Sequence, residues 1–171
     1  QNNMVFSFSQ YEASGTASRL GIRNKADATI RSHLMELDNF LKGAMDSWNA
    51  YCSRKGMRGG FMVTSGYRCP QLNSNIGGSA KKSAHMSGYA DDTVPINGNH
   101  QEYFKWALEF AKSGVRFDQI IVEGAKGTHW VHFGYKNGSG SQRMQTMSYN
   151  GSNYSMISAG TPTYRNENDN L

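Results

Sequence analysis

His85-Met86-Ser87-Gly88-Tyr89-Ala90-Asp91-Asp92 is the stretch of the sequence that constrains the fold most, because it places a histidine and an aspartate seven residues apart. On an unbroken helix these two side chains would share a face but would be separated by roughly 10 Å along the axis. Bonds of about 2.0–2.2 Å to one metal ion could not span that separation. The chain must turn between His85 and Asp92 if they act together, and Gly88 supplies the backbone freedom to do so.

Residues 90–94 read as a strand that follows this turn. Alternation along the strand places Ala90, Asp92 and Val94 on one face, so that Asp91 points the other way. Asp92 is then expected among apolar neighbours, where an unpaired carboxylate is costly. A metal ion would remove that cost, and a buried aspartate satisfied by loop amides is the alternative.

A second strand-like segment, Trp130-Val131-His132-Phe133-Gly134-Tyr135, offers another ligand. Alternation places His132 on one face beside Trp130, while the apolar residues that flank it in sequence occupy the core side. A histidine that faces a cleft in this way fits a third metal ligand beside His85 and Asp92. Taken alone it would more often be structural, so the prediction depends on all three residues.

The rest of the pattern predicts a loop-rich α+β protein. Apolar residues spaced by three and four predict a long helix from about Asp27 to Lys55, and a second helix is expected from about Asn99 to Ser113. The expected strands are 61–64, 90–94, a hairpin formed by 120–123 and 130–133, and an edge hairpin formed by 143–149 and 154–157 around Asn150-Gly151. Residues 65–89 read as a long loop without regular structure, which in a compact domain is usually functional or disordered.

Composition narrows the class of protein. The 171 residues carry a formal net charge of +5, but the basic residues are scattered and form no basic helix, so no nucleic-acid partner is expected. No apolar run of about 18 residues is present, which excludes membrane insertion, and no signal peptide is visible. Cys52 and Cys69 are compatible with two buried thiols or with one disulfide.

Several short motifs, taken together, carry a resemblance. They are Ser65-Gly66-Tyr67-Arg68, Leu72-Asn73, Gly77-Gly78, Ser83-Ala84-His85, Gly88, Ala90, Asp92 and Trp130-Val131-His132, with Thr16 to Ile22 upstream. The set resembles the zinc D-alanyl-D-alanine carboxypeptidase family, in particular its short members often encoded by phages, over about residues 5–157. The resemblance implies a small antiparallel sheet with flanking helices, the fold these enzymes share with the hedgehog signalling domain. It also implies one zinc peptidase domain over 1–157, followed by a polar tail over 158–171.

The resemblance assigns roles residue by residue. His85, Asp92 and His132 match the ligands of one Zn²⁺, with water in the fourth position, and Arg68 matches an arginine that steadies the substrate and the developing oxyanion. Many relatives carry an acid three residues before the last ligand, where this chain has His129.

Glu123 matches a glutamate common in this branch, and hairpin pairing would bring it opposite Trp130 on the metal face. We favour Glu123 as general base, with His129 as the alternative base or transition-state donor. Asn73 and the Gly77-Gly78 turn are expected to shape the loop, whereas Tyr67 and Trp130 fit either the substrate groove or the core.

The implied function is zinc-dependent hydrolysis of stem or cross-bridge peptides of bacterial peptidoglycan, by a carboxypeptidase or endopeptidase acting at the cell wall. The implied partner is the peptidoglycan peptide, and a monomer is expected unless the chain is part of a virion. The main alternative is a catalytically inactive zinc-containing module that binds the wall or builds a virion. A metal-free domain, in which the same histidines and aspartate are ordinary polar core residues, is a third possibility.

Overall fold

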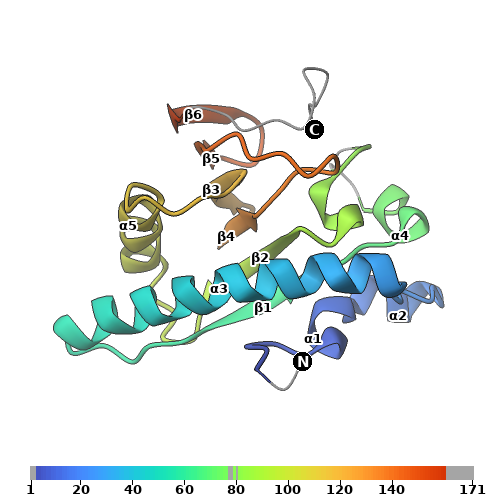
Figure 1. The fold of residues 1–171 in the computed structure, drawn as a ribbon, viewed down its shortest axis with the longest axis horizontal. Coiled ribbons are helices and arrows are strands. Elements are labelled where there is room, and N and C mark those ends of the chain that lie inside the picture. Colours follow the sequence, from blue (N-terminus) through green and yellow to red (C-terminus); the bar gives the residue numbers. More distant parts are fainter. Residues whose placement is uncertain (1–2, 77–78, 80, 161–171) are drawn as a thin grey trace.

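The computed structural model describes residues 3–76, 79 and 81–160 (Figure 1). Their helical elements are α1 (Phe8–Glu12), α2 (Gly15–Leu20), α3 (Ala28–Arg54), α4 (Pro70–Ser74), the 3-10 turn η1 (Ala84–Ser87) and α5 (His100–Ala111). Their strands are β1 (Phe61–Ser65), β2 (Ala90–Pro95), β3 (Gln119–Ala125), β4 (Thr128–Gly134), β5 (Gln145–Tyr149) and β6 (Tyr154–Ala159). None of these helices is both long and apolar enough to cross a membrane.

The strands form one mixed sheet in the order β1-β2-β4-β3-β5-β6. Neighbouring strands are antiparallel except β3 and β5, which are parallel. The expected small antiparallel sheet is therefore wrong in both size and direction. The reason lies in residues 135–144, which carry the chain from the end of β4 past β3 to its far edge. Arg143 fixes this crossing, because its Nη2 and Nε lie 2.7 and 2.8 Å from the carboxylate oxygens of the buried Asp118.

The hydrophobic core lies between one face of the sheet and the two long helices. Helix α3 starts where the Asp27 side chain accepts from Ile30 N, and every three or four residues it buries an apolar side chain, from Leu34 to Trp48. These side chains pack with Trp106 and Phe110 of α5 and with Val131 and Phe133 of β4. Both long helices agree with the sequence prediction to within a few residues.

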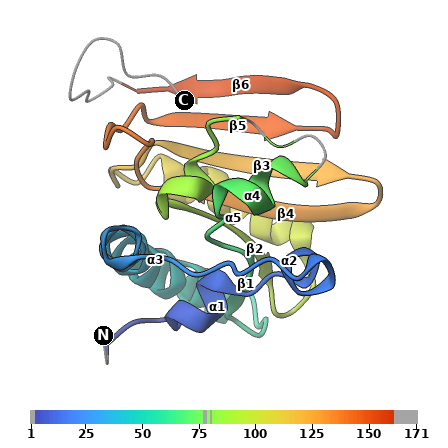
Figure 2. The same cartoon turned by 90° about the vertical axis from the view of Figure 1, so that its right-hand side faces the viewer.

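Helix α4, between β1 and β2 in the chain, lies on the side of the sheet away from α5. In Figures 1 and 2, α4 and α5 stand on opposite sides of β3 and β4. Residues 65–89 were expected to lack regular structure, but they contain α4 and η1. Both are too short to leave a periodic pattern, and the Cys69-Pro70 and Ser83 starts are their only local signals. The Gly77-Gly78 turn lies outside the described residues.

The edge hairpin agrees with the prediction, since Asn150 Oδ1 accepts from Ser152 N and Asn153 N in the turn between β5 and β6. Strand β6 extends to Ala159, so the first residues of the expected tail belong to the sheet, and residues 161–171 lie outside the described part. Cys52 and Cys69 are both free thiols, which excludes the disulfide alternative in this structure.

Candidate metal centre

The three candidate ligands come from three separate elements. His85 is presented by η1, Asp92 by β2 and His132 by β4, and the β2–β4 register pairs Asp92 directly with His132. Gly88 ends η1 with φ 82°, and a Cβ at this position would lie 2.9 Å from the carbonyl oxygen of Ile30. Only glycine therefore permits the turn that returns the chain from His85 to β2.

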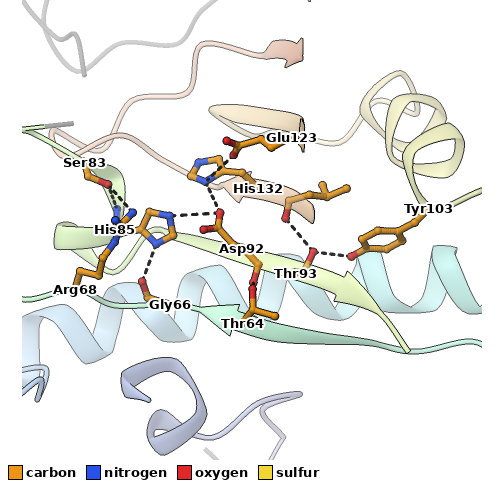
Figure 3. A network of polar contacts seen from close by, with 11 residues as sticks. Thr64, Gly66, Arg68, Ser83, His85, Asp92, Thr93, Tyr103, Glu123 and His132 are labelled. Carbon is orange, nitrogen blue, oxygen red and sulfur yellow. Dashed lines mark hydrogen bonds and ion pairs between the residues drawn. The ribbon is translucent and has the colours of Figure 1, made fainter. Parts of the chain in front are cut away.

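The three side chains converge on one point (Figure 3). His85 Nε2 lies 3.5 Å and His132 Nδ1 lies 3.1 Å from the same oxygen, Oδ1 of Asp92. One ligand atom from each residue lies within 4.8 Å of the other two. Tetrahedral zinc with bonds of about 2.0–2.1 Å requires ligand atoms about 3.3–3.4 Å apart. The two separations from Asp92 Oδ1 fall close to that value, so the three residues fit a metal ion of this size.

The backbone carbonyl of Gly66 sets the tautomer of His85. Its oxygen lies 2.7 Å from His85 Nδ1. Because a carbonyl can only accept, Nδ1 carries the proton, and the Nε2 lone pair is free to bind a metal. Gly66 itself packs against the backbone of Tyr11, where a Cβ would collide with the Tyr11 carbonyl oxygen. The Ser65-Gly66 segment thus fixes the orientation of the His85 ring through the Nδ1 atom that faces away from the metal site.

At His85 and Asp92, electrostatics favours the protonation states that metal binding needs. Burial lowers the pKa of His85 and outweighs the attraction of Asp92, so the neutral imidazole is favoured. Burial alone would raise the pKa of Asp92, but the two imidazoles beside it, His85 and His132, hold it below its ordinary range. Burial would likewise lower the pKa of His132, yet its hydrogen bond to Asp92 and the charges of Asp92 and Glu123 raise it. Asp92 is thus an ionised acceptor at the centre of the group.

The donor set is compatible with zinc. Two imidazole nitrogens and one carboxylate oxygen suit Zn²⁺, and three protein ligands leave a position open for water or substrate. Structural zinc sites are closed by four protein ligands. Within the described residues this is the one group of three or more such side chains placed closely enough to hold an ion.

Arg68 lies beside this group, just after β1. Its Nη2 is 3.4 Å from Ser83 Oγ, and its Nε is buried with no hydrogen-bond partner among the described residues. Burial lowers the pKa of Arg68, while the charges of Asp92 and Glu123 raise it, so the guanidinium lies within their electrostatic reach. An arginine stays charged under these conditions and can donate to an oxygen of a bound ligand.

The two candidates for the general base lie on opposite faces of the sheet. Glu123 pairs in register with Trp130, and its Oε2 lies 4.0 Å from His132 Nδ1. Burial raises the pKa of Glu123 to about 7. The charge of Asp92 adds to this increase, whereas the charge of His132 and a hydrogen bond from Trp130 reduce it. His129 instead stacks on His100 of α5, with ring centroids 4.1 Å apart and an interplanar angle of 2°.

One expectation about β2 needs correction. Asp92 was expected among apolar neighbours, but its side chain is 20% exposed and faces the two histidines. The carboxylate that enters the core is Asp91, which is fully buried. Alternation was assigned correctly, but the sequence of the strand does not tell which face is covered by α3 and α5.

Sequence reasoning missed two residues on the metal face, Tyr149 and Tyr154. Tyr149 of β5 pairs in register with Glu123, and Tyr154 of β6 pairs in register with Tyr149. Alternation within the edge hairpin puts them on one face, but only the parallel β3–β5 pairing reveals that this is the metal face.

Comparison with known proteins places the chain in a family. Residues 18–132 match the family model described as Peptidase M15. No curated protein and no solved structure matches the chain. The matched range covers more than half of the 171 residues, contains all three candidate ligands and confirms the resemblance drawn from the motifs. The chain therefore belongs to the peptidase M15 family.

Proposed function

We propose that this protein is a zinc-dependent peptidase that cleaves peptide bonds in the stem or cross-bridge peptides of bacterial peptidoglycan. The observation that carries the proposal is the convergence of His85, Asp92 and His132 within 4.8 Å, with the carboxylate of Glu123 beside them. The choice of peptidoglycan is supported by the resemblance of the Ser65 to Arg68, His85 to Asp92 and Trp130 to His132 motifs to zinc D-alanyl-D-alanine carboxypeptidases.

The chemistry divides between the metal and the chain. When bound, Zn²⁺ acidifies a water molecule and polarises a carbonyl oxygen. Glu123, with a pKa of about 7, can accept a proton and return it to the departing amine. Arg68 can donate from its Nε, which has no partner in the described part of the chain, to the oxygen on which negative charge develops or to a terminal carboxylate.

The main alternative, an inactive zinc-containing module, shares the metal ligands but needs no proton carrier. A buried glutamate beside a ligand is costly unless it is used or neutralised. Glu123 is such a residue, being buried with a raised pKa and lying on the metal face. Its position favours the enzyme over the module.

Digestion of purified peptidoglycan tests the proposal. We expect the protein to release new amino groups, a chelator to stop the release, and added Zn²⁺ to restore it. His85→Ala should release nothing, and mass spectrometry of the products identifies the bond. Binding to peptidoglycan without release, in protein that contains zinc, would support the inactive module instead.

A further inference from the structure

A row of side chains crosses the metal face from the candidate base to the edge of the sheet. The register pairs Trp130 of β4 with Glu123 of β3, Glu123 with Tyr149 of β5, and Tyr149 with Tyr154 of β6. Register partners on neighbouring strands lie side by side and share a face. The four residues therefore form one continuous line that begins next to His132.

The two tyrosines at the outer end of this row contact each other and solvent. Their ring centroids lie 4.5 Å apart, and Tyr154 is 56% exposed. In the neighbouring row, which starts at His132, Met147 and Met156 occupy the same two strands, and Met156 is 51% exposed. Exposed aromatic and methionine side chains that adjoin a reactive group are typical of a ligand-binding surface.

Electrostatics ties the outer tyrosine to the metal centre. Partial burial and the negative charges of Glu123, Tyr149 and Asp92 raise the pKa of Tyr154 to about 12, against the opposing charge of Arg68. Tyr154 therefore keeps its proton at neutral pH, and it lies in the electrostatic field of the groups around the metal centre.

The length of the row sets the size of the ligand segment. Two strand spacings of about 4.8 Å separate β3 from β6, so Glu123 and Tyr154 are roughly 10 Å apart across the sheet. An extended peptide advances about 3.3 Å per residue. A peptide whose reacting bond lies by Glu123 would reach Tyr149 with the residue one or two positions away and Tyr154 with the residue about three positions away.

We propose that Tyr149 and Tyr154, the tyrosine pair, bind the substrate peptide up to about three residues from the cleaved bond and so select substrates by length. This inference rests on the proposed peptidase function. The pair lies beyond residue 132, where the match to the family model ends, so membership of the family does not assign it. The tyrosine pair supplies flat apolar contact at low conformational cost, which affects binding more than the chemical step.

Steady-state kinetics on two substrate lengths tests the proposal. The long substrates are soluble muropeptides, and their cleavage products identify the bond that is cut. The short substrate is a synthetic peptide that contains this bond with one residue on each side. Tyr154→Ala should raise KM for the muropeptides about tenfold, with kcat changed by less than about twofold and the short peptide unaffected. Tyr154→Phe should restore most of the loss, and Tyr149→Ala provides a second variant if Tyr154→Ala fails to fold. Ile157→Ala, on the same strand and 45% exposed, is the control and should match the parent.

Each other outcome overturns the inference in an identifiable way. If Tyr154→Ala behaves like Ile157→Ala on muropeptides, the tyrosine pair does not bind substrate, while the peptidase function stands. Equal losses on both substrate lengths would assign the pair a structural role. An unchanged KM together with a shift from dimer to monomer in sedimentation would identify the pair as a contact between two copies of the chain. A parent protein that cleaves no muropeptide would remove the proposed function, and this inference with it.

Discussion

Asp91 and Asp92 are consecutive residues of β2 and have opposite surroundings. Asp92 lies 3.1 and 3.5 Å from two imidazole nitrogens, which hold its pKa below the ordinary range. Asp91 points into the core, where neither carboxyl oxygen has a hydrogen-bond partner in the described part of the chain. Burial, reinforced by the charge of Asp92, raises the pKa of Asp91 well above its ordinary value.

The contrast shows that the polar partners of a carboxylate, rather than its burial, decide whether it has a function or only destabilises the fold. Asp38 of α3 is also buried, but it accepts from Val5 N, Phe6 N and Tyr11 Oη and so anchors the N-terminal segment to the long helix. Asp92 has partners that a metal ion would join. In the described part of the chain, Asp91 has neither hydrogen-bond donors nor metal-binding neighbours. Removing the carboxylate should therefore have different effects on activity and stability at positions 91 and 92.

The largest effect is expected from removal of the carboxylate on the metal face. Asp92→Ala deletes the oxygen that both imidazoles approach, so we expect loss of zinc and a fall in peptidoglycan digestion of roughly 10³-fold or more. Elemental analysis and product release measure the two effects. Asp91→Asn, one residue away, is the matched control and should keep its zinc and its activity. Full zinc content in Asp92→Ala would contradict the ligand assignment.

Glu123→Gln is expected to have the next largest effect. The amide cannot take up a proton, so kcat should fall by about 10²–10⁴-fold while zinc content stays near that of the parent. A base must be ionised to act, so activity of the parent should fall as the pH decreases through the pKa of Glu123. That pKa is about 7 without metal, and a bound cation would lower it. A pH–rate profile of the parent measures this fall in activity. An unchanged kcat in Glu123→Gln would exclude Glu123 as the general base.

The sequence predicted the local elements better than their arrangement. Periodicity identifies α3 and α5, and alternation assigns the faces of β2 and β4, because both signals lie within a few consecutive residues. The parallel β3–β5 pairing depends on the crossing segment and on the Asp118–Arg143 contact, 25 positions apart in the chain. No local pattern reports such a contact. For the same reason the tyrosine pair was missed, and Asp91 was not recognised as the core carboxylate.

Asp91→Val should stabilise the fold. It replaces a buried, unpartnered carboxyl with a β-branched apolar side chain, so we expect a gain of about 1–3 kcal/mol in the free energy of unfolding. The gain should grow as pH rises, because the folded chain holds a proton on Asp91 that the unfolded chain releases above its ordinary pKa of 3.8. Urea unfolding at pH 5 and pH 8 measures both quantities. Lower stability of Asp91→Val at both pH values would mean that the carboxyl has a stabilising partner.

The smallest effect is expected from His129→Ala, although His129 was the alternative candidate for the general base. The β3–β4 register runs without a shift from the Ala125–Thr128 pair to the Gln119–Gly134 pair. Residues 129 and 132, three apart on a regular strand, must therefore point to opposite faces. We expect kcat within about twofold of the parent and a loss of stability below about 1 kcal/mol, from the lost stacking on His100.

His132→Ala, assayed beside it, should lose zinc and activity together. A fall of 100-fold or more in kcat for His129→Ala, with zinc retained, would move the base to His129 and require β4 to bulge in the active enzyme. If His129→Ala keeps the kcat of the parent and Glu123→Gln loses most of it, the metal ligands and the general base all lie on the metal face. The Glu123–Trp130 register allows this, because it places a carboxylate of the partner strand on the face that carries His132.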